Sequence, residues 1–142
     1  MTELEQLTET SEEARKDINI LLHQLSERLP ECSMELLKDI LDDRHTEMWI
    51  VREDKHIIAM GVLTLVVIPE GIKGRIEDVV VHADCRGKGL GQKMMEKLIN
   101  RARERGVPSL ELSSRTERAA AIRLYEKVGF TKWDTNVYRL KL

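Results

Sequence analysis

Residues 79–91 are Val-Val-Val-His-Ala-Asp-Cys-Arg-Gly-Lys-Gly-Leu-Gly. The apolar run at the start is typical of a buried strand, and an amphipathic helical pattern follows the last glycine. Glycine lets the backbone turn tightly and approach a ligand closely. The first amides of a helix lack intrahelical partners and carry partial positive charge, so a helix start binds phosphate. With Arg86 and Lys88 beside it, this stretch predicts a strand, a phosphate-binding turn and a helix.

The turn does not fit the two common nucleotide-binding patterns. A P-loop requires G-x-x-x-x-G-K-[ST], which the chain lacks, and the alternating glycines at 87, 89 and 91 break the Rossmann spacing G-x-G-x-x-G. What remains is R-x-x-G-x-G from Arg86 to Gly91. Taken alone, this pattern also allows an ordinary flexible connection between a strand and a helix.

Segment 75–106 resembles the acetyl-CoA-binding motif of the GNAT superfamily of N-acetyltransferases. In that family the turn holds the coenzyme A pyrophosphate through main-chain amides, and the preceding strand pairs with the pantetheine arm. The resemblance implies that acetyl-CoA is the co-substrate and that no metal is used. It assigns the pantetheine to Val79, Val80 and Val81, and the pyrophosphate to Arg86, Gly87, Lys88, Gly89, Leu90, Gly91 and Gln92.

A second match lies downstream, where residues 124–130 (Leu-Tyr-Glu-Lys-Val-Gly-Phe) resemble the family pattern L-Y-x-x-x-G-F. Residues 135–139 (Thr-Asn-Val-Tyr-Arg) resemble the tail of a bacterial subgroup, so the likeness covers about residues 46–142. One position departs from the family, because Arg118 stands where many members carry a cofactor-binding Asn. We expect Ser114 and Arg118 beside the cofactor, although Ser114 also fits a capping box with Glu117.

Tyr125 is the candidate general acid, because the family's tyrosine at this position points at the coenzyme A sulfur. A proton donor stabilises the leaving thiolate. The alternative role is packing, since Tyr125 shares a helix face with Ala121 and Val128.

Glu77 is the candidate base, or the residue that orders a water acting as base. Strand alternation places Glu77 on the face of Val79 and Val81, opposite Asp78, so one of the two carboxylates points into the site. A carboxylate beside an apolar strand can have a raised pKa, which suits a base. The alternative is a surface ion pair of Glu77 with Arg75 or Lys73.

The composition of the chain limits the classes of function that are possible. The chain has 142 residues, 42% hydrophobic, 4% aromatic and 34% charged, with a net charge of −2. These values predict one domain over residues 1–142 and argue against nucleic-acid or membrane partners. No apolar run approaches the roughly 20 residues of a membrane span, and the acidic N-terminus is unlike a secretory signal. Cys32 and Cys85 form neither a disulfide framework nor a zinc pattern, so we expect a cytoplasmic protein.

Periodicity predicts the elements. Helices are expected over 11–28, with Thr10 and Glu13 as a capping box, after Ser33, from Leu90 to Gly106, and over 115–128. Strands are expected over 47–52, 56–68, 74–82 and 109–113, with a turn at 53–55 and room for two more strands in 130–142. The sequence thus predicts a mixed α/β or α+β domain with a GNAT-type, largely antiparallel sheet flanked by helices.

The predicted activity is acetyl transfer to a primary amine of a small molecule or peptide, by direct attack in a ternary complex. A non-catalytic acyl-CoA-binding or regulatory module on the same fold is the alternative, and a homodimer stays open. A phosphate-binding domain unrelated to coenzyme A is disfavoured by the absent nucleotide motifs.

Overall fold

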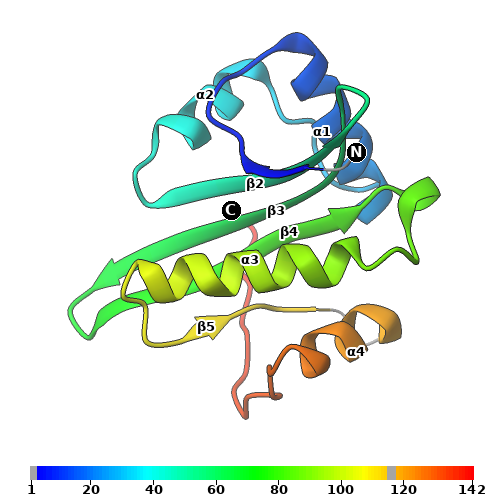
Figure 1. The fold of residues 1–142 in the computed structure, drawn as a ribbon. Coiled ribbons are helices and arrows are strands. Elements are labelled where there is room, and N and C mark those ends of the chain that lie inside the picture. Colours follow the sequence, from blue (N-terminus) through cyan, green and yellow to red (C-terminus); the bar gives the residue numbers. More distant parts are fainter. Residues whose placement is uncertain (1–2, 115–117) are drawn as a thin grey trace.

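The structure is a computed structural model that describes residues 3–114 and 118–142. Within these residues, five strands form one sheet in the order β1-β2-β3-β4-β5 (Figure 1). The first four strands pair antiparallel, and β5 is parallel to β4. The strands are β1 (Glu3–Gln6), β2 (Thr46–Glu53), β3 (His56–Ile68), β4 (Gly71–Val81) and β5 (Leu110–Glu111). The helices are α1 (Glu12–Leu25), α2 (Met34–Asp42), the short η1 (Ala83–Cys85), α3 (Leu90–Glu104) and α4 (Ala119–Lys127). The expected mixed, largely antiparallel sheet with flanking helices is confirmed.

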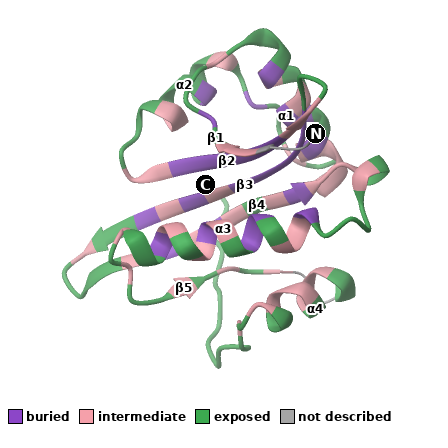
Figure 2. Cartoon of the chain, in the orientation of Figure 1, coloured by how far each residue is buried: buried purple, intermediate pink, exposed green. Residues whose placement is uncertain are grey.

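Helices cover both faces of the sheet, so the apolar side chains form two clusters. On one face α3 packs with Met94, Met95 and Leu98, each fully buried, and α4 and β5 add partly buried side chains. On the other face α1 and α2 pack through Ile18, Leu21 and Leu37. Strands β2 and β3 are buried along most of their length because both faces are covered (Figure 2).

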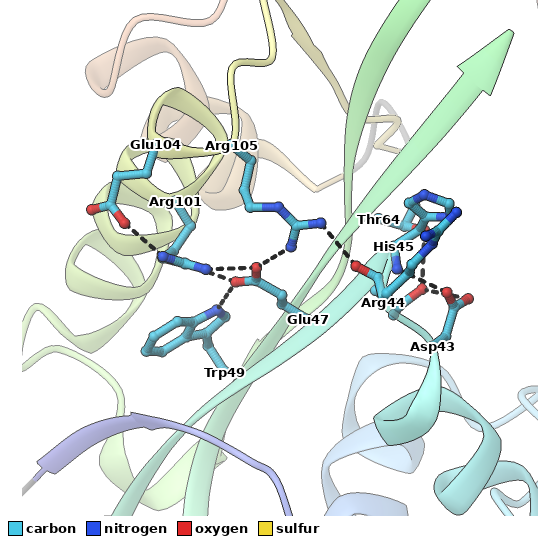
Figure 3. A network of polar contacts seen from close by, with 10 residues as sticks. Asp43, Arg44, His45, Glu47, Trp49, Thr64, Arg101, Glu104 and Arg105 are labelled. Atoms are coloured by element: carbon cyan, nitrogen blue, oxygen red, sulfur yellow. Dashed lines mark hydrogen bonds and ion pairs between the residues drawn. The ribbon is translucent and has the colours of Figure 1, made fainter.

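A buried carboxylate fixes α3 to the sheet. Glu47 of β2 is 4% exposed and accepts hydrogen bonds from Trp49 Nε1 (2.9 Å), Arg101 Nε and Nη2 (both 2.8 Å) and Arg105 Nη1 (2.6 Å). Figure 3 shows both arginines reaching down from the end of α3 to this one side chain. Burial alone would raise the pKa of Glu47, but the hydrogen bonds together outweigh it and lower the pKa to about 2. We call Glu47, Trp49, Arg101 and Arg105 the Glu47 network.

A β-bulge interrupts β4 next to its end. Val62 pairs with Glu77 and Met60 pairs with Val80, so two residues of β4, Asp78 and Val79, lie opposite Gly61 alone. Asp78 has φ +51°, a left-handed conformation that few residues other than glycine adopt and that Asp and Asn tolerate best. Bulges re-aim side chains and occur often beside active sites. This bulge breaks the strict alternation that the sequence analysis assumed for Glu77 and Asp78.

The ends of several elements differ from the sequence prediction. Ser11 rather than Thr10 caps α1, with its hydroxyl accepting from Ala14 N at 3.0 Å. The helix ends at Leu25 because Asn19 binds the backbone of Cys32 through its Oδ1 (2.7 Å) and Nδ2 (3.0 Å), which draws the connecting segment back along α1. The expected helix start after Ser33 is confirmed, with the Ser33 hydroxyl as its N-cap, and the two-residue turn at 54–55 joins β2 to β3.

The C-terminal half departs further. The predicted strand at 109–113 is confined to β5, and the short strand β1 was not predicted. Helix α4 begins at Ala119 with Arg118 as its N-cap residue. The predicted helix start at 115 and Glu117, the expected capping-box partner of Ser114, lie outside the described residues. The two strands expected in 130–142 are not formed: residues 131–142 are all exposed, and Figure 1 draws them as an extended trace beyond α4. A strand needs a hydrogen-bonded neighbour, which apolar alternation alone does not supply.

No helix in 3–114 or 118–142 is both long and apolar enough to span a bilayer.

Candidate active site

A small cavity of about 110 Å³ lies between β4 and α4. It contains both candidate catalytic residues, Glu77 and Tyr125, together with Asp78 and Arg118. The remaining lining residues come from the end of α1, from β4 and from the segment after β5: Leu25, Ile76, Val79, Leu112 and Ser113. We call this the β4–α4 cavity. Residues that lie up to 100 positions apart in the sequence therefore meet at one place.

The cavity forms where β4 and β5 separate. Strand β5 pairs with β4 only at Gly74 and Arg75, while β4 continues to Val81. In the described residues, this edge of β4 has no strand partner beyond Arg75, so its backbone groups face the opening. The last carbonyl of the edge, that of Val81, accepts a hydrogen bond from Arg86 Nε at 3.1 Å. Such an edge can pair with an extended ligand that carries amide groups.

The three valines before the turn have two orientations. Val79 and Val81 are partly buried on the α3 side, next to the free edge. Val80 is 5% exposed and belongs to the cluster under α1 and α2, so its side chain points away from that opening. Only the backbone of Val80 is therefore available at the edge.

The glycine turn leaves the start of α3 open. Gly87 and Gly89 have φ +82° and +80°, and a Cβ built on either would meet no atom within 4 Å. Gly89 is the N-cap of α3, where no side chain caps the helix and no acidic residue occupies the first turn. The carbonyl of Gly89 accepts from Lys93 N, which leaves the amides of residues 90–92 without intrahelical partners. Lys88 is exposed beside them, so the donors and charges of the turn fit a pyrophosphate.

Other residues of the turn serve packing rather than ligand contact. The side chain of Leu90 is 5% exposed and lies in the α3 core. A Cβ on Gly91 would come within 3.2 Å of Leu124 Cδ2, so glycine at this position lets α4 approach α3. The side-chain amide of Gln92 donates to Glu96 at 2.9 Å, which leaves its backbone amide for a ligand.

Tyr125 lies half-buried in the wall of the β4–α4 cavity. Its ring meets that of Phe130 edge to face, with centroids 6.4 Å apart. Burial raises the pKa of Tyr125, and the charge of Arg118 opposes that rise. A tyrosine with a raised pKa stays protonated at neutral pH and can donate a proton. Both the packing role and the proposed acid role fit this position.

Glu77 has a cationic partner. Its Oε1 accepts from Arg75 Nε at 3.0 Å, and Arg75 also lies 3.6 Å from Glu111 of β5. The structure therefore contains the surface ion pair that the sequence analysis gave as the alternative for Glu77. The Glu77 carboxylate is therefore engaged by a neighbouring guanidinium group on the same strand.

Asp78 was not selected as a site residue from the sequence, although the analysis placed it opposite Glu77. In the described part of the chain its carboxylate has neither a hydrogen bond nor a cationic partner. Burial raises the pKa of Asp78, and the neighbouring charge of Glu77 adds to the rise. Only the β-bulge distinguishes Asp78 as a candidate site residue. The bulge is a structural feature, because no sequence pattern predicts an Asp in the left-handed conformation.

A second cavity, of about 230 Å³, lies between the sheet and the first two helices. We call it the α1–α2 cavity. Its wall is apolar except for Glu31, Cys32 and Asp78. The apolar lining residues are Ile18, Leu22, Leu29, Pro30, Leu36, Leu37, Ile40, Met48, Met60 and Val62. Among the described residues, Asp78 is the one that lines both cavities.

Comparison with known proteins identifies relatives. The sequence profile described as the acetyltransferase (GNAT) family matches residues 12–130. A ribosomal protein bS18 alanine N-acetyltransferase from Salmonella typhimurium is 33% identical over 90 residues, 63% of this chain and 57% of that protein. An L-methionine sulfoximine/L-methionine sulfone acetyltransferase from Pseudomonas paraeruginosa is 40% identical over 62 residues, 43% of this chain and 36% of that protein. The match spans about half the length of these curated relatives or less.

Solved structures share the fold. A Trypanosoma brucei acetyltransferase superposes with a TM-score of 0.80 at 28% identity, covering 100% of both chains. A Clostridium acetobutylicum protein solved with acetyl-CoA superposes with a TM-score of 0.80 at 21% identity, covering 99% of this chain and 96% of that one.

Proposed function

Because this chain belongs to the GNAT acetyltransferase family, we propose that it transfers the acetyl group of acetyl-CoA to a primary amine. The observation that supports this most strongly is the free edge of β4, which leads directly into three uncapped amides at the start of α3. The β4–α4 cavity, with its tyrosine, lies beside the same edge. The acceptor is an amine of a small molecule or peptide, and we assign the protein to the cytoplasm on the sequence argument given above.

The residues present fit coenzyme A. The amides of residues 90–92, with Arg86 and Lys88, would hold the pyrophosphate. The backbone of 79–81 would pair with the pantetheine arm, and the side chains of Val79 and Val81 would line it. Arg118 and Ser114 would lie beside the cofactor near the cavity. These assignments follow the family resemblance and are consistent with the positions of the residues.

In the proposed reaction both substrates are bound together and the amine nitrogen attacks the thioester carbonyl. A carbon–nitrogen bond forms, the carbon–sulfur bond breaks, and the sulfur takes a proton. Tyr125 is the proposed donor, because its side chain lines the cavity and burial keeps its hydroxyl in the protonated form. The amine must lose its ammonium proton before it attacks, and Glu77, directly or through a water, is the base that the sequence suggested.

The decisive experiment is an amine screen in which the purified protein and acetyl-CoA are incubated with single acceptors and free thiol is followed. Acetyl-CoA-dependent thiol release with at least one amine, with the acetylated product identified by mass spectrometry, would support the enzyme. Tight acetyl-CoA binding without turnover on any amine, peptide N-termini included, would instead support a non-catalytic acyl-CoA-binding module.

A further inference from the structure

Asp78 is placed to serve both cavities. It belongs to the wall of the apolar α1–α2 cavity and to the wall of the β4–α4 cavity that holds Tyr125. The β-bulge and the left-handed backbone at Asp78 turn its side chain out of the regular strand pattern. Left-handed non-glycine residues are energetically costly and are concentrated at functional sites. In the described residues, this carboxylate is the feature that the walls of the two cavities share.

The charges around Asp78 favour a cation there. The charge of Glu77 on β4 acts on Asp78, and Glu31 lines the same α1–α2 cavity. Each of these two carboxylates has an arginine partner, Arg75 at 3.0 Å for Glu77 and Arg15 at 3.9 Å for Glu31, whereas Asp78 has none in the described residues. Cys32, in the same cavity, feels the negative charge of Asp78, and burial raises the pKa of its thiol. Arg118 and Tyr125 line only the β4–α4 side. Among the described residues that line the α1–α2 cavity there is no lysine, arginine or histidine, so this carboxylate has no cationic neighbour on that side.

The rest of the α1–α2 cavity selects for an apolar group. Ten of its thirteen lining residues are aliphatic, proline or methionine side chains. A polyamine or an aminosugar placed there would bury several amines or hydroxyls without hydrogen-bonding partners, and each such group weakens binding. An alkyl or aryl group would instead exchange water for an apolar wall.

We propose that the acceptor is a primary amine with an apolar substituent, which lies in the α1–α2 cavity while the ammonium group binds Asp78. This rests on the proposed acetyltransferase function and names the acceptor class for it. In this arrangement Asp78 takes the role of base that the sequence suggested for its neighbour Glu77. Asp78 accepts the ammonium proton, the neutral nitrogen forms the bond to the acetyl carbon, and the carbon–sulfur bond breaks with a proton passing from Tyr125 to sulfur. The nitrogen loses two protons in all; one restores Tyr125, and the other is released to solvent from Asp78.

The first test compares two acceptors, phenethylamine for the apolar class and spermidine for the polycationic class. We expect kcat/KM for phenethylamine to exceed that for spermidine by at least about 10-fold, since one unpaired buried polar group already costs this much. Asp78→Asn keeps the side-chain shape and the tolerance for left-handed φ. It should lower kcat/KM for phenethylamine by about 10- to 100-fold, the range of one charge-assisted hydrogen bond, with acetyl-CoA affinity unchanged.

Asp39→Asn is the matched control, because it removes the same charge from an exposed position on α2. This change should leave kcat/KM for phenethylamine within about 2-fold, as exposed charges contribute little. Val62→Phe should narrow the α1–α2 cavity and raise KM for phenethylamine more than for ethylamine, with thermal unfolding checking the fold. A preference for spermidine that is lost in Asp39→Asn and kept in Asp78→Asn would overturn the proposal and leave the acetyltransferase function standing.

Failure of the proposed acetyltransferase function can be distinguished from failure of the proposed acceptor site. If no amine is acetylated, the proposed function fails, and calorimetric titration of phenethylamine into the protein saturated with coenzyme A decides the acceptor site alone. Binding that is weakened by Asp78→Asn and not by Asp39→Asn supports the site. No binding, or equal binding to both variants, overturns it.

Discussion

Two carboxylates, on β2 and on β4, behave in opposite ways in the same sheet. Glu47 is almost fully buried, yet its pKa falls to about 2, because three side chains donate four hydrogen bonds to it (Figure 3). Asp78 keeps more solvent exposure as a residue, but its carboxylate lies in the wall of two cavities, and the partial burial there raises its pKa. The difference lies in the partners, since burial raises the pKa in both cases. A carboxylate with every acceptor position used holds the fold together, whereas an unpartnered one is available to a ligand.

The two ends of α3 differ in the same way, because in the described part of the chain the polar groups at one end have partners and those at the other end do not. At its C-terminal end, Arg101 and Arg105 are committed to the Glu47 network. At its N-terminal end, neither a capping side chain nor an acidic residue meets the helix amides. We therefore expect one end of the helix to serve stability and the other to serve acetyl-CoA binding, so that mutations can separate the two roles.

The largest effect is expected for Glu47→Gln. The amide cannot accept from both arginines, so two guanidinium groups lose their buried counter-charge, which typically costs about 3–5 kcal/mol. We expect a loss of that size in the free energy of unfolding, measured with urea, while the folded fraction binds acetyl-CoA with unchanged affinity. Glu104→Gln removes the exposed partner of Arg101 and should cost less than about 1 kcal/mol. Equal losses in the two variants would contradict the central role of Glu47.

The pH dependence of stability should show the same network. The pKa of Glu47 is lowered in the folded state from its ordinary 4.5 to about 2, so its contribution is complete above pH 4.5 and lost as the pH falls toward 2. The size of this contribution is on the order of 3 kcal/mol. The difference in unfolding free energy between the natural chain and Glu47→Gln should therefore shrink across this window. A difference that stays constant down to pH 2 would show that the charge of Glu47 is not responsible.

Tyr125→Phe tests the β4–α4 cavity instead of the Glu47 network. The variant keeps the edge-to-face contact with Phe130 and removes only the hydroxyl, so stability and acetyl-CoA affinity should hardly change. The rate constant kcat should fall by roughly 10²-fold, which is the lower range for general acid catalysis. A change confined to KM would assign Tyr125 to substrate binding instead. Full activity would leave it as a packed aromatic residue.

The sequence predicted what depends on local patterns. Helix α3, the hairpin of β2 and β3, and the cap at Ser33 follow from periodicity and residue type. The family itself was identified from the glycine turn and the segment 124–130, and the profile match confirms it. Each of these sequence patterns lies within a few residues of the helix, turn or cap that it predicts.

What the sequence missed depends on contacts between distant segments. The Glu47 network joins residues more than 50 positions apart, and nothing near Glu47 in the sequence marks it as buried. The bulge at Asp78 arises from the register against β3, and the early end of α1 depends on Asn19 reaching Cys32. The tail 130–142 had room for two strands, but it pairs with none of the described strands.

Two glycines at opposite ends of α3 provide a smaller and better matched test. Gly89 and Gly106 have similar positive φ values, +80° and +75°, and a Cβ on either would enter open space. Gly→Ala at each should therefore cost a similar amount of stability, about 1–2 kcal/mol, from the left-handed backbone alone. Only Gly89→Ala should also weaken acetyl-CoA binding in calorimetry, by about 10-fold, because the methyl group occupies space at the helix start. Equal acetyl-CoA affinity in both variants would remove the turn from the binding site.

The smallest expected effect is a gain of stability in Asp78→Asn. Because the folded-state pKa of Asp78 is raised above its ordinary 3.8, the ionised carboxylate destabilises the native protein at neutral pH. That penalty is present above the folded-state pKa and disappears as the pH falls below 3.8, where Asp78 is protonated in both states. Asn is neutral and tolerates left-handed φ as Asp does, so the variant should unfold at slightly higher urea concentration at pH 7 and match the natural chain at pH 3. A residue that lowers stability where it is charged, and lowers activity when neutralised, is retained for function. A loss of stability at pH 7 would instead mean that Asp78 has a partner in the folded protein, and its comparison with Glu47 would fail.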